Sequence, residues 1–290
     1  MRYQYVSMKT TKAEIKWPDY ALLDSGDFEK WERFGKLTVV RPEPLAIWHK
    51  AEAKAWKQAD LIYKRIDDKK GEWQGANPSA DWQMSYGKMF FKLRPTSFKH
   101  VGVFPEQAGN WEWIQKTVKP GDKVLNLFAY TGGASMAAAL AGAEVVHLDG
   151  SKPVVDWAKE NAQASGLADK IRFITDDAGK FAAREARRGN KYEAIFLDPP
   201  AFGHGPKNQL WKFEQDLPKF LESLQTLSNP KRGCILLNTY ALSFPGTAME
   251  QLLRTTIPQL RVIGSVETVL TEGQDRHFVI SAGLATRATW

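Results

Sequence analysis

The chain has 290 residues, of which 43% are hydrophobic and 25% are charged, and its formal net charge is +7. This size and composition exclude intrinsic disorder and predict one large globular domain or, more simply, two ordinary ones. A single cysteine excludes an internal disulfide and a thiolate metal cluster, so we expect a reducing compartment, the cytoplasm. We expect no secretory signal, no membrane span and no metal site, since the start is polar, no long apolar stretch follows and the five histidines are scattered.

Residues 1–110 are the more basic part of the chain, and we expect a β-rich N-terminal domain that contributes to substrate binding. They carry 19 Lys and Arg against 14 Asp and Glu, whereas residues 111–290 carry 21 against 19. Basic surfaces favour polyanionic partners such as RNA. Short apolar segments broken by Pro and Gly predict strands, and Ala, Trp and Leu at helical spacing predict one helix. The strands are expected at 36–40, 45–48, 88–93 and 98–104, and the helix at 51–62.

Four tryptophans, Trp48, Trp56, Trp73 and Trp82, are interleaved with lysines in this basic part. Aromatic rings beside cations can stack on the bases of single-stranded nucleic acid and hold its backbone. The alternative is that the tryptophans belong to the core and the lysines to a solvated surface.

From residue 111 onward, apolar strand-like segments alternate with helical ones, which predicts a domain over 111–290 with an α/β fold, a Rossmann-like parallel sheet covered by helices on both faces. The last two of seven expected strands are joined by a short polar link, which predicts an antiparallel ending at one edge. The expected strands are 123–128, 144–149, 171–175, 194–198, 234–239, 262–270 and 277–284. The expected helices are 133–141, 153–164, 178–188, 213–227 and 247–257.

The first motif is a strand that ends at Phe128 and continues through Tyr130 and Thr131 to Gly132 and Gly133. In open α/β sheets, ligands bind beyond the carboxyl ends of the strands, and glycines allow the backbone to approach them closely. The start of the following helix offers free N–H groups to an anion. The alternative is a tight turn without a ligand.

The second motif is Asp149, at the end of the next strand and followed by Gly150 and Ser151. A carboxylate at this position can accept hydrogen bonds from both hydroxyls of a ribose, in NAD or in S-adenosyl-L-methionine. The alternative is that Asp149 caps the following helix. The loop after the first strand reads YTGGASM and lacks the pattern G-x-G-x-x-G, which counts against a dinucleotide.

Two further acidic motifs follow the next two strands. After the third strand comes Asp176-Asp177, and we favour Asp177 as an acceptor for the adenine amino group, with a solvated turn as the alternative. After the fourth strand come Asp198, Pro199, Pro200 and, two residues later, Phe202. Two prolines form a rigid corner, Asp198 can accept a hydrogen bond or a proton from a nucleophile, and Phe202 can stack on a ring. The alternative is a strand-ending turn.

Together these motifs resemble the bacterial class I S-adenosylmethionine-dependent methyltransferases related to the large-subunit ribosomal RNA cytosine-C5 and guanine methyltransferases. The resemblance covers roughly residues 86–240 and is carried by NLFAYTGG, LDGS, DDA and LDPPAF, with YGKMFFKLRPTSFKHVGVFPEQ upstream. It implies that S-adenosyl-L-methionine is held by Phe128, Tyr130, Thr131, Gly132, Gly133, Asp149, Gly150, Ser151 and Asp177. It also implies that Phe104 and Gln107 lie over the cofactor and that Asp198, Pro199, Pro200 and Phe202 face its methyl group.

The chain departs from the cytosine-C5 branch at Ala241, which stands where that branch has a cysteine after the fifth strand. That chemistry needs a thiolate, and the only thiol, Cys234, lies at the start of the strand. The opening pattern of an RNA-binding PUA module is also absent, which counts against an RNA substrate. Because the cysteine is missing, we predict methyl transfer to a base nitrogen; that the base belongs to RNA, ribosomal RNA above all, is what the resemblance implies. His204 could assist or be a solvated loop residue.

Other readings stay open at this point: a small-molecule or protein methyltransferase, a module that senses the cofactor without transferring its methyl, and an NAD-dependent dehydrogenase. The methylated atom, the substrate and the oligomeric state are likewise open.

Overall fold

The structure is a computed structural model that describes residues 17–67, 70–77, 79, 81–204, 210–240, 244–273 and 276–290. The contacts among these residues divide the chain into two compact units. We call residues 109–268 with 282–290 the α/β unit, and residues 17–108 with 269–281 the β unit. None of the helices in the described ranges is both long and apolar enough to cross a membrane.

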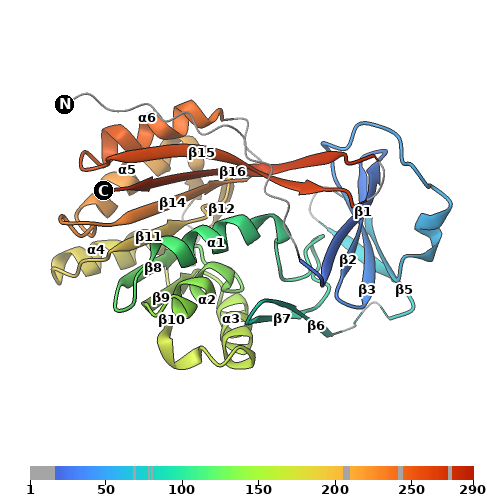
Figure 1. The fold of residues 1–290 in the computed structure, drawn as a ribbon, viewed down its shortest axis with the longest axis horizontal. Helices are drawn as coiled ribbons and strands as arrows, with labels where there is room; N and C mark the ends of the chain where they lie inside the picture. Colours follow the sequence, from blue (N-terminus) through green and yellow to red (C-terminus); the bar gives the residue numbers. More distant parts are fainter. Residues whose placement is uncertain are drawn as a thin grey trace. The chain divides into compact units, whose positions relative to one another are not determined.

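A seven-stranded sheet forms the centre of the α/β unit (Figure 1), with the order β10-β9-β8-β11-β14-β16-β15. The first five strands in this order, from β10 to β14, run parallel to one another, and β16 is antiparallel to β14. Their bounds are β8 Lys123–Leu127, β9 Glu144–Asp149, β10 Ile171–Thr175, β11 Ala194–Leu197, β14 Cys234–Thr239, β15 Val262–Thr271 and β16 Val279–Thr289. The predicted fold, with seven strands and an antiparallel ending at one edge, is confirmed.

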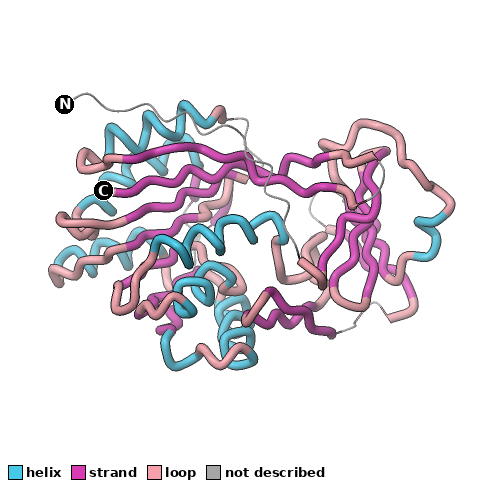
Figure 2. Tube along the Cα trace, in the orientation of Figure 1, coloured by secondary structure: helices cyan, strands magenta, loops and turns pink. Residues whose placement is uncertain are grey.

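The central strands β11 and β14 are buried along their whole length, as expected where helices cover a parallel sheet on both faces. Figure 1 shows α1, α2 and α3 on one face and α4, α5 and α6 on the other, and Figure 2 shows the same layers by secondary structure. The bounds are α1 Ala108–Thr117, α2 Gly133–Leu140, α3 Lys152–Ala164, η3 Ala168–Lys170, α4 Ala178–Arg187, α5 Phe213–Gln225 and α6 Gly246–Thr256. A short antiparallel ribbon, β12 Phe202–His204 with β13 Leu210–Lys212, precedes α5.

The β unit contains a five-stranded sheet with the order β1-β2-β3-β4-β5 and a separate pair, β6 and β7. All of these pairings are antiparallel except that of β3 with β4. The bounds are β1 Tyr20–Gly26, β2 Glu29–Phe34, β3 Leu37–Pro42, η1 Ala55–Gln58, β4 Leu61–Arg65, β5 Gly71–Gly75, β6 Trp82–Tyr86, β7 Met89–Leu93 and η2 Pro105–Gln107. The expected strands near 36–40 and 88–93 correspond to β3 and β7.

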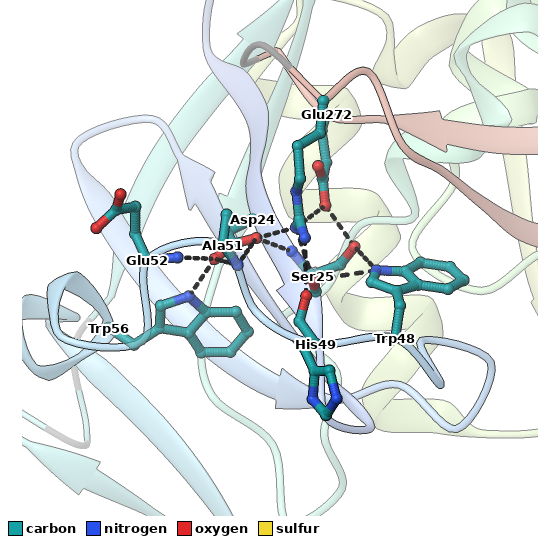
Figure 3. A network of polar contacts seen from close by, with 9 residues as sticks. Asp24, Ser25, Trp48, His49, Ala51, Glu52, Trp56 and Glu272 are labelled. Atoms are coloured by element: carbon teal, nitrogen blue, oxygen red, sulfur yellow. Dashed lines mark hydrogen bonds and ion pairs between the residues drawn. The ribbon is translucent and has the colours of Figure 1, made fainter.

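The helix predicted over 51–62 is wrong, because this segment contains only the single 3₁₀ turn η1 before β4 begins at Leu61. The reason is the buried carboxylate of Asp24, on the neighbouring β1 (Figure 3). It accepts the backbone N–H groups of Ala51 and Glu52 and the indole N–H of Trp56, at 2.8 to 3.3 Å. Asp24, distant in the sequence, thus binds N–H groups at the start of the segment and holds the backbone in a non-helical path. The helical spacing of apolar residues gives no information about such a contact.

The strands predicted near 45–48 and 98–104 are also absent from the described β unit. The first segment lies against a turn, with the Phe28 N–H bonded to the carbonyl of Ala46 at 2.9 Å. The second folds back on the chain before it, with the Thr96 N–H bonded to the carbonyl of His100 at 3.1 Å. In both places isolated hydrogen bonds replace a ladder.

The four tryptophans of the basic part are integrated into the β unit. Each indole N–H donates to a protein acceptor: Trp48 to Ser25, Trp56 to Asp24, Trp73 to Thr96 and Trp82 to Phe34. Trp56 and Trp82 are buried. The core alternative therefore describes these side chains better than an exposed stacking surface.

Candidate functional site

Three of the predicted motifs meet at one edge of the seven-stranded sheet because of its register. Leu127 of β8 is paired with Leu148 of β9 on one side and with Leu197 of β11 on the other. The residues that follow these leucines are Phe128, Asp149 and Asp198. Parallel strands bring their carboxyl ends together, so a glycine-containing loop and two carboxylates border the same edge.

The loop from Phe128 to Gly132 has a strained backbone. Phe128 and Tyr130 adopt left-handed conformations with φ of 56° and 49°, and Gly132 has φ of 94°. Left-handed backbone is disfavoured for bulky residues, and it persists where the surrounding structure enforces it, often at ligand sites. The loop therefore has the conformational character of a binding site.

Neighbouring elements hold this loop in place from several sides. The Ala129 N–H donates to the carbonyl of Leu148 at 3.1 Å, and the buried Asn161 amide of α3 donates to the carbonyl of Thr131 at 3.0 Å. Trp111 of α1 packs so closely that a Cβ at Gly133 would lie 2.6 Å from its indole. Only glycine fits at position 133 without a shift of the Trp111 ring.

Asp149 connects the loop to the start of α3. Its carboxylate accepts the Tyr130 N–H at 3.0 Å and the Ser151 N–H at 2.9 Å, one on each oxygen. Burial raises the pKa of Asp149, and the N–H groups of Ser151, Tyr130 and Gly150 oppose that shift. The N-cap position of α3 belongs to Ser151, so Asp149 is not the cap that the alternative reading proposed.

A buried polar row lies beneath the loop and was missed in the sequence analysis. Asn126 of β8 donates to the Ser135 hydroxyl of α2 at 2.8 Å, and that hydroxyl lies 3.0 Å from Nδ1 of His147 in β9. Burial lowers the pKa of His147 to about 3, so its ring is neutral at physiological pH. The signal in the sequence was a polar residue within an otherwise apolar strand: Asn126 in β8 and His147 in β9.

Asp177 lies at the start of α4 and caps that helix. Its Oδ1 accepts the Lys180 N–H at 2.8 Å. The neighbouring Asp176 instead forms an ion pair with Arg184; burial opposes ionisation of Asp176, but this pairing leaves its pKa lowered. The two adjacent acids therefore have separate partners, and the contact of Asp177 with adenine stays a prediction.

The corner after β11 lies beside the loop. The Asp198 N–H reaches the carbonyl of Leu127 at 3.4 Å. Pro199 is buried and Pro200 is exposed, while the Phe202 side chain is 60% exposed. A half-buried carboxylate and an exposed aromatic ring thus flank a corner that has no backbone donors at its two prolines.

The remaining predicted residues belong to the β unit or lie outside the described residues. Phe104, the N-cap of η2, and Gln107, its last residue, belong to the β unit. Their contact with the cofactor stays a prediction. Ala241 and the side chain of His204 lie outside the described residues.

A sequence model of one protein family matches residues 43–279, and this family is described as S-adenosylmethionine-dependent methyltransferase. The chain belongs to this family. The match covers most of both units and agrees with the resemblance found in the motifs.

Known proteins similar to this chain include a methyltransferase of solved structure and two proteins named as ribosomal RNA methyltransferases. A crystal structure described as the SAM dependent methyltransferase from Agrobacterium tumefaciens is 39% identical, has a TM-score of 0.85, and is matched over 93% of this chain and 90% of that one. The ribosomal RNA large subunit methyltransferases K/L of Alteromonas mediterranea and Shewanella frigidimarina are 30% and 34% identical over 77% and 61% of this chain. The chain spans only 31% and 24% of these two longer proteins.

The cofactor of the family is S-adenosyl-L-methionine, and the site fits it. A carboxylate has about four acceptor sites, so Asp149 retains capacity for ribose hydroxyls beside its backbone donors. Gly132 is the N-cap of α2 and has no side chain to cap the helix, so the first N–H groups of α2 favour a carboxylate such as that of methionine. The dinucleotide alternative is set aside by the family membership.

Proposed function

We propose that this methyltransferase transfers a methyl group to a base nitrogen in RNA, most simply ribosomal RNA. The observation that carries the proposal is the corner of Asp198, Pro199 and Pro200, with its half-buried carboxylate beside the cofactor loop and exposed Phe202 two residues further on. The names of the two ribosomal RNA relatives support the choice of substrate.

The proposed roles follow from the chemistry of each group. When bound, S-adenosyl-L-methionine supplies an already activated methyl group, so the protein mainly orients the acceptor and excludes water. Asp198 accepts a hydrogen bond from the attacking nitrogen or takes its proton. The rigid proline corner fixes the carboxylate, and Phe202 stacks on the base. Phe128, Tyr130, Thr131, Gly132, Gly133, Asp149, Gly150, Ser151 and Asp177 hold the cofactor, with Phe104 and Gln107 from the β unit.

The single thiol argues for nitrogen over ring carbon as the acceptor. Cys234 is the only cysteine of the chain, it is 3% exposed, and it lies at the start of β14, at the amino-terminal end of the strand. Burial raises its pKa to about 12, so it remains a thiol at physiological pH. Methylation at cytosine C5 requires a thiolate that adds to the ring, whereas methylation of a nitrogen requires none.

The basic N-terminal part is proposed to bind the RNA. Residues 1–110 have an excess of five positive charges, and binding to phosphates by such residues weakens steeply as salt concentration rises. We place the enzyme in the cytoplasm, where RNA is available and a chain with one cysteine needs no disulfide.

The substrate is tested by mass spectrometry of nucleosides from RNA of strains with and without the gene. The expected result is the loss of one methylated base from ribosomal RNA in the deletion strain and its return on complementation. An unchanged set of modified nucleosides would count against RNA and favour a small molecule or a protein as the acceptor.

The role of Asp198 is tested with total RNA from the deletion strain as the methyl acceptor. Asp198→Ala is expected to lower turnover about 10²- to 10⁴-fold, while the Kd for S-adenosylhomocysteine stays within about twofold. Asp198→Asn retains an acceptor but cannot take a proton, so it separates the two roles. An Asp198→Ala variant with normal cofactor binding and full turnover would overturn the proposal.

A further inference from the structure

Trp211 is a residue of the α/β unit that no motif singled out. It occupies the middle of β13, opposite Gly203 of β12 in the antiparallel ribbon. Its indole N–H donates to the carbonyl of Pro200 at 2.7 Å. The contact joins the ribbon to the proline corner.

The ring of Trp211 also contacts the cofactor loop. Its centroid lies 5.6 Å from that of Phe128 and 5.8 Å from that of Phe220 in α5. Phe128 is the first left-handed residue of the loop. Edge-on and tilted aromatic contacts at these separations are favourable, so the three rings form one packed cluster. One side chain thus connects the loop after β8 with the corner after β11.

The proline corner receives a donor from elsewhere in the chain. Pro199 and Pro200 have no N–H, so neither can fix the corner by donating a backbone hydrogen bond. The Asp198 N–H contacts the carbonyl of Leu127 at the long distance of 3.4 Å. The 2.7 Å hydrogen bond from the Trp211 indole to the Pro200 carbonyl adds a shorter restraint on the orientation of this corner.

The geometry of the ribbon separates Trp211 from the exposed aromatic ring. In an antiparallel pair, opposite residues lie on the same face and successive residues alternate between faces. Phe202 is opposite Lys212, whereas Gly203 is opposite Trp211. Trp211 therefore occupies the inner face, against Phe128, and the 60% exposed Phe202 occupies the outer one.

We propose that Trp211 is a positioning residue that fixes the corner of Asp198 to Phe202 relative to the cofactor loop. The inference rests on the proposed function, in which this corner holds the acceptor base. The indole N–H sets the Pro200 carbonyl, and the ring supports Phe128. Loss of the N–H alone should misplace the acceptor without weakening cofactor binding, because the ring contact with Phe128 is retained.

Trp211→Phe removes the N–H and keeps an aromatic ring, whereas Trp211→Leu removes both. With total RNA from the deletion strain, Trp211→Phe is expected to lower kcat about tenfold and to leave the KM for cofactor and the Kd for S-adenosylhomocysteine within about twofold. Trp211→Leu is expected to weaken S-adenosylhomocysteine binding as well. Hydrogen exchange at the Phe213 amide, which donates to the carbonyl of Ala201, should be about fivefold faster in Trp211→Phe.

Trp290→Phe is a matched control. The Trp290 indole N–H donates to the carbonyl of Asn229, also at 2.7 Å, and its ring packs at Gly233, next to the start of β14. This variant loses a hydrogen bond of the same length, but near the amino-terminal end of β14 and not near the carboxyl ends of the strands. It should retain kcat and the exchange rate of Phe213.

The outcomes separate this inference from the proposed function. Parent-like kcat and Phe213 exchange in folded Trp211→Phe would overturn the positioning role, as would an equal loss of kcat in Trp290→Phe. If Asp198→Ala loses turnover in the same assay while Trp211→Phe does not, only the positioning role fails. If Asp198→Ala keeps full turnover, the proposed site itself fails. The exchange measurement needs no methyl acceptor, so it decides the structural part of the inference on its own.

Discussion

Each of the two units has an aspartate near the end of a strand, but the two carboxylates differ in how completely their acceptor sites are used. In the β unit, Asp24 is 4% exposed, and its carboxylate accepts hydrogen bonds from several surrounding groups (Figure 3). These are the N–H groups of Ser25, Ala51 and Glu52, the Trp56 indole and the Arg276 guanidinium. Such a carboxylate is saturated and holds the structure together.

In the α/β unit, half-buried Asp149 accepts two backbone N–H groups on separate oxygens and retains acceptor capacity. Left-handed residues follow both strands, Asp27 and Phe28 after β1 and Phe128 and Tyr130 after β8, so backbone strain does not separate the two carboxylates. They differ in unused acceptor capacity, and the proposed contact of Asp149 with the ribose rests on this difference.

The largest effect is expected from removal of the saturated carboxylate of Asp24. Asp24→Ala is expected to lower the free energy of unfolding by about 3–5 kcal/mol, because it leaves buried donors, including the Arg276 guanidinium, without their acceptor. Urea denaturation measures the change. Asp156→Ala is the control. This exposed residue pairs with Lys152 across one helical turn, and its substitution should cost less than about 0.5 kcal/mol. A loss below about 1 kcal/mol for Asp24→Ala would contradict the structural role.

The second prediction concerns the carboxylate with unused capacity. Asp149→Asn is expected to weaken S-adenosylhomocysteine binding by roughly 2–3 kcal/mol, because the amide places a donor where ribose hydroxyls or backbone N–H groups also donate. Asp149→Asn should lower the free energy of unfolding by less than Asp24→Ala does. Calorimetry measures the Kd, and unchanged affinity would remove Asp149 from the cofactor site.

The third prediction uses pH to probe the buried row under the loop. The His147 pKa is about 3 in the native protein and about 6.5 when unfolded, so between these values the unfolded chain binds a proton that the native protein does not. Acidification through this window therefore destabilises the fold by about 1.4 kcal/mol per pH unit.

Asp149 acts with the opposite sign, because its raised pKa lets the native protein take up a proton more readily than the unfolded chain does. The contribution of His147 is therefore isolated by comparing the parent with His147→Gln in urea denaturation from pH 6.5 to pH 5. The variant should show the shallower dependence, and equal slopes would disprove the assignment.

The local patterns of the α/β unit were sufficient to predict its fold. Strands of this sheet are continuous apolar segments separated by helical periodicity, and a parallel sheet brings the residues after each strand together at one edge. This is why Gly132, Asp149 and Asp198 could be placed at one site before the register was known. Alternation in the β unit was less informative, since irregular segments near 45–48 and 98–104 have the same apolar content as strands.

The sequence by itself determined the order of the seven strands of the α/β unit and of the helices between them, the acidic residues at strand ends and the absence of a second thiol, because these depend on residues close together in the chain. Only the tertiary structure decided which acceptors are saturated. Residues 269–281 complete the β unit, where buried Glu272 accepts the Ser25 hydroxyl at 2.5 Å. Asp24 replaced a predicted helix by a single turn, and Trp211 reached the Pro200 carbonyl from a short ribbon. Hydrogen bonds between distant segments leave no periodic trace in a sequence, so their geometry emerges only when the chain has folded.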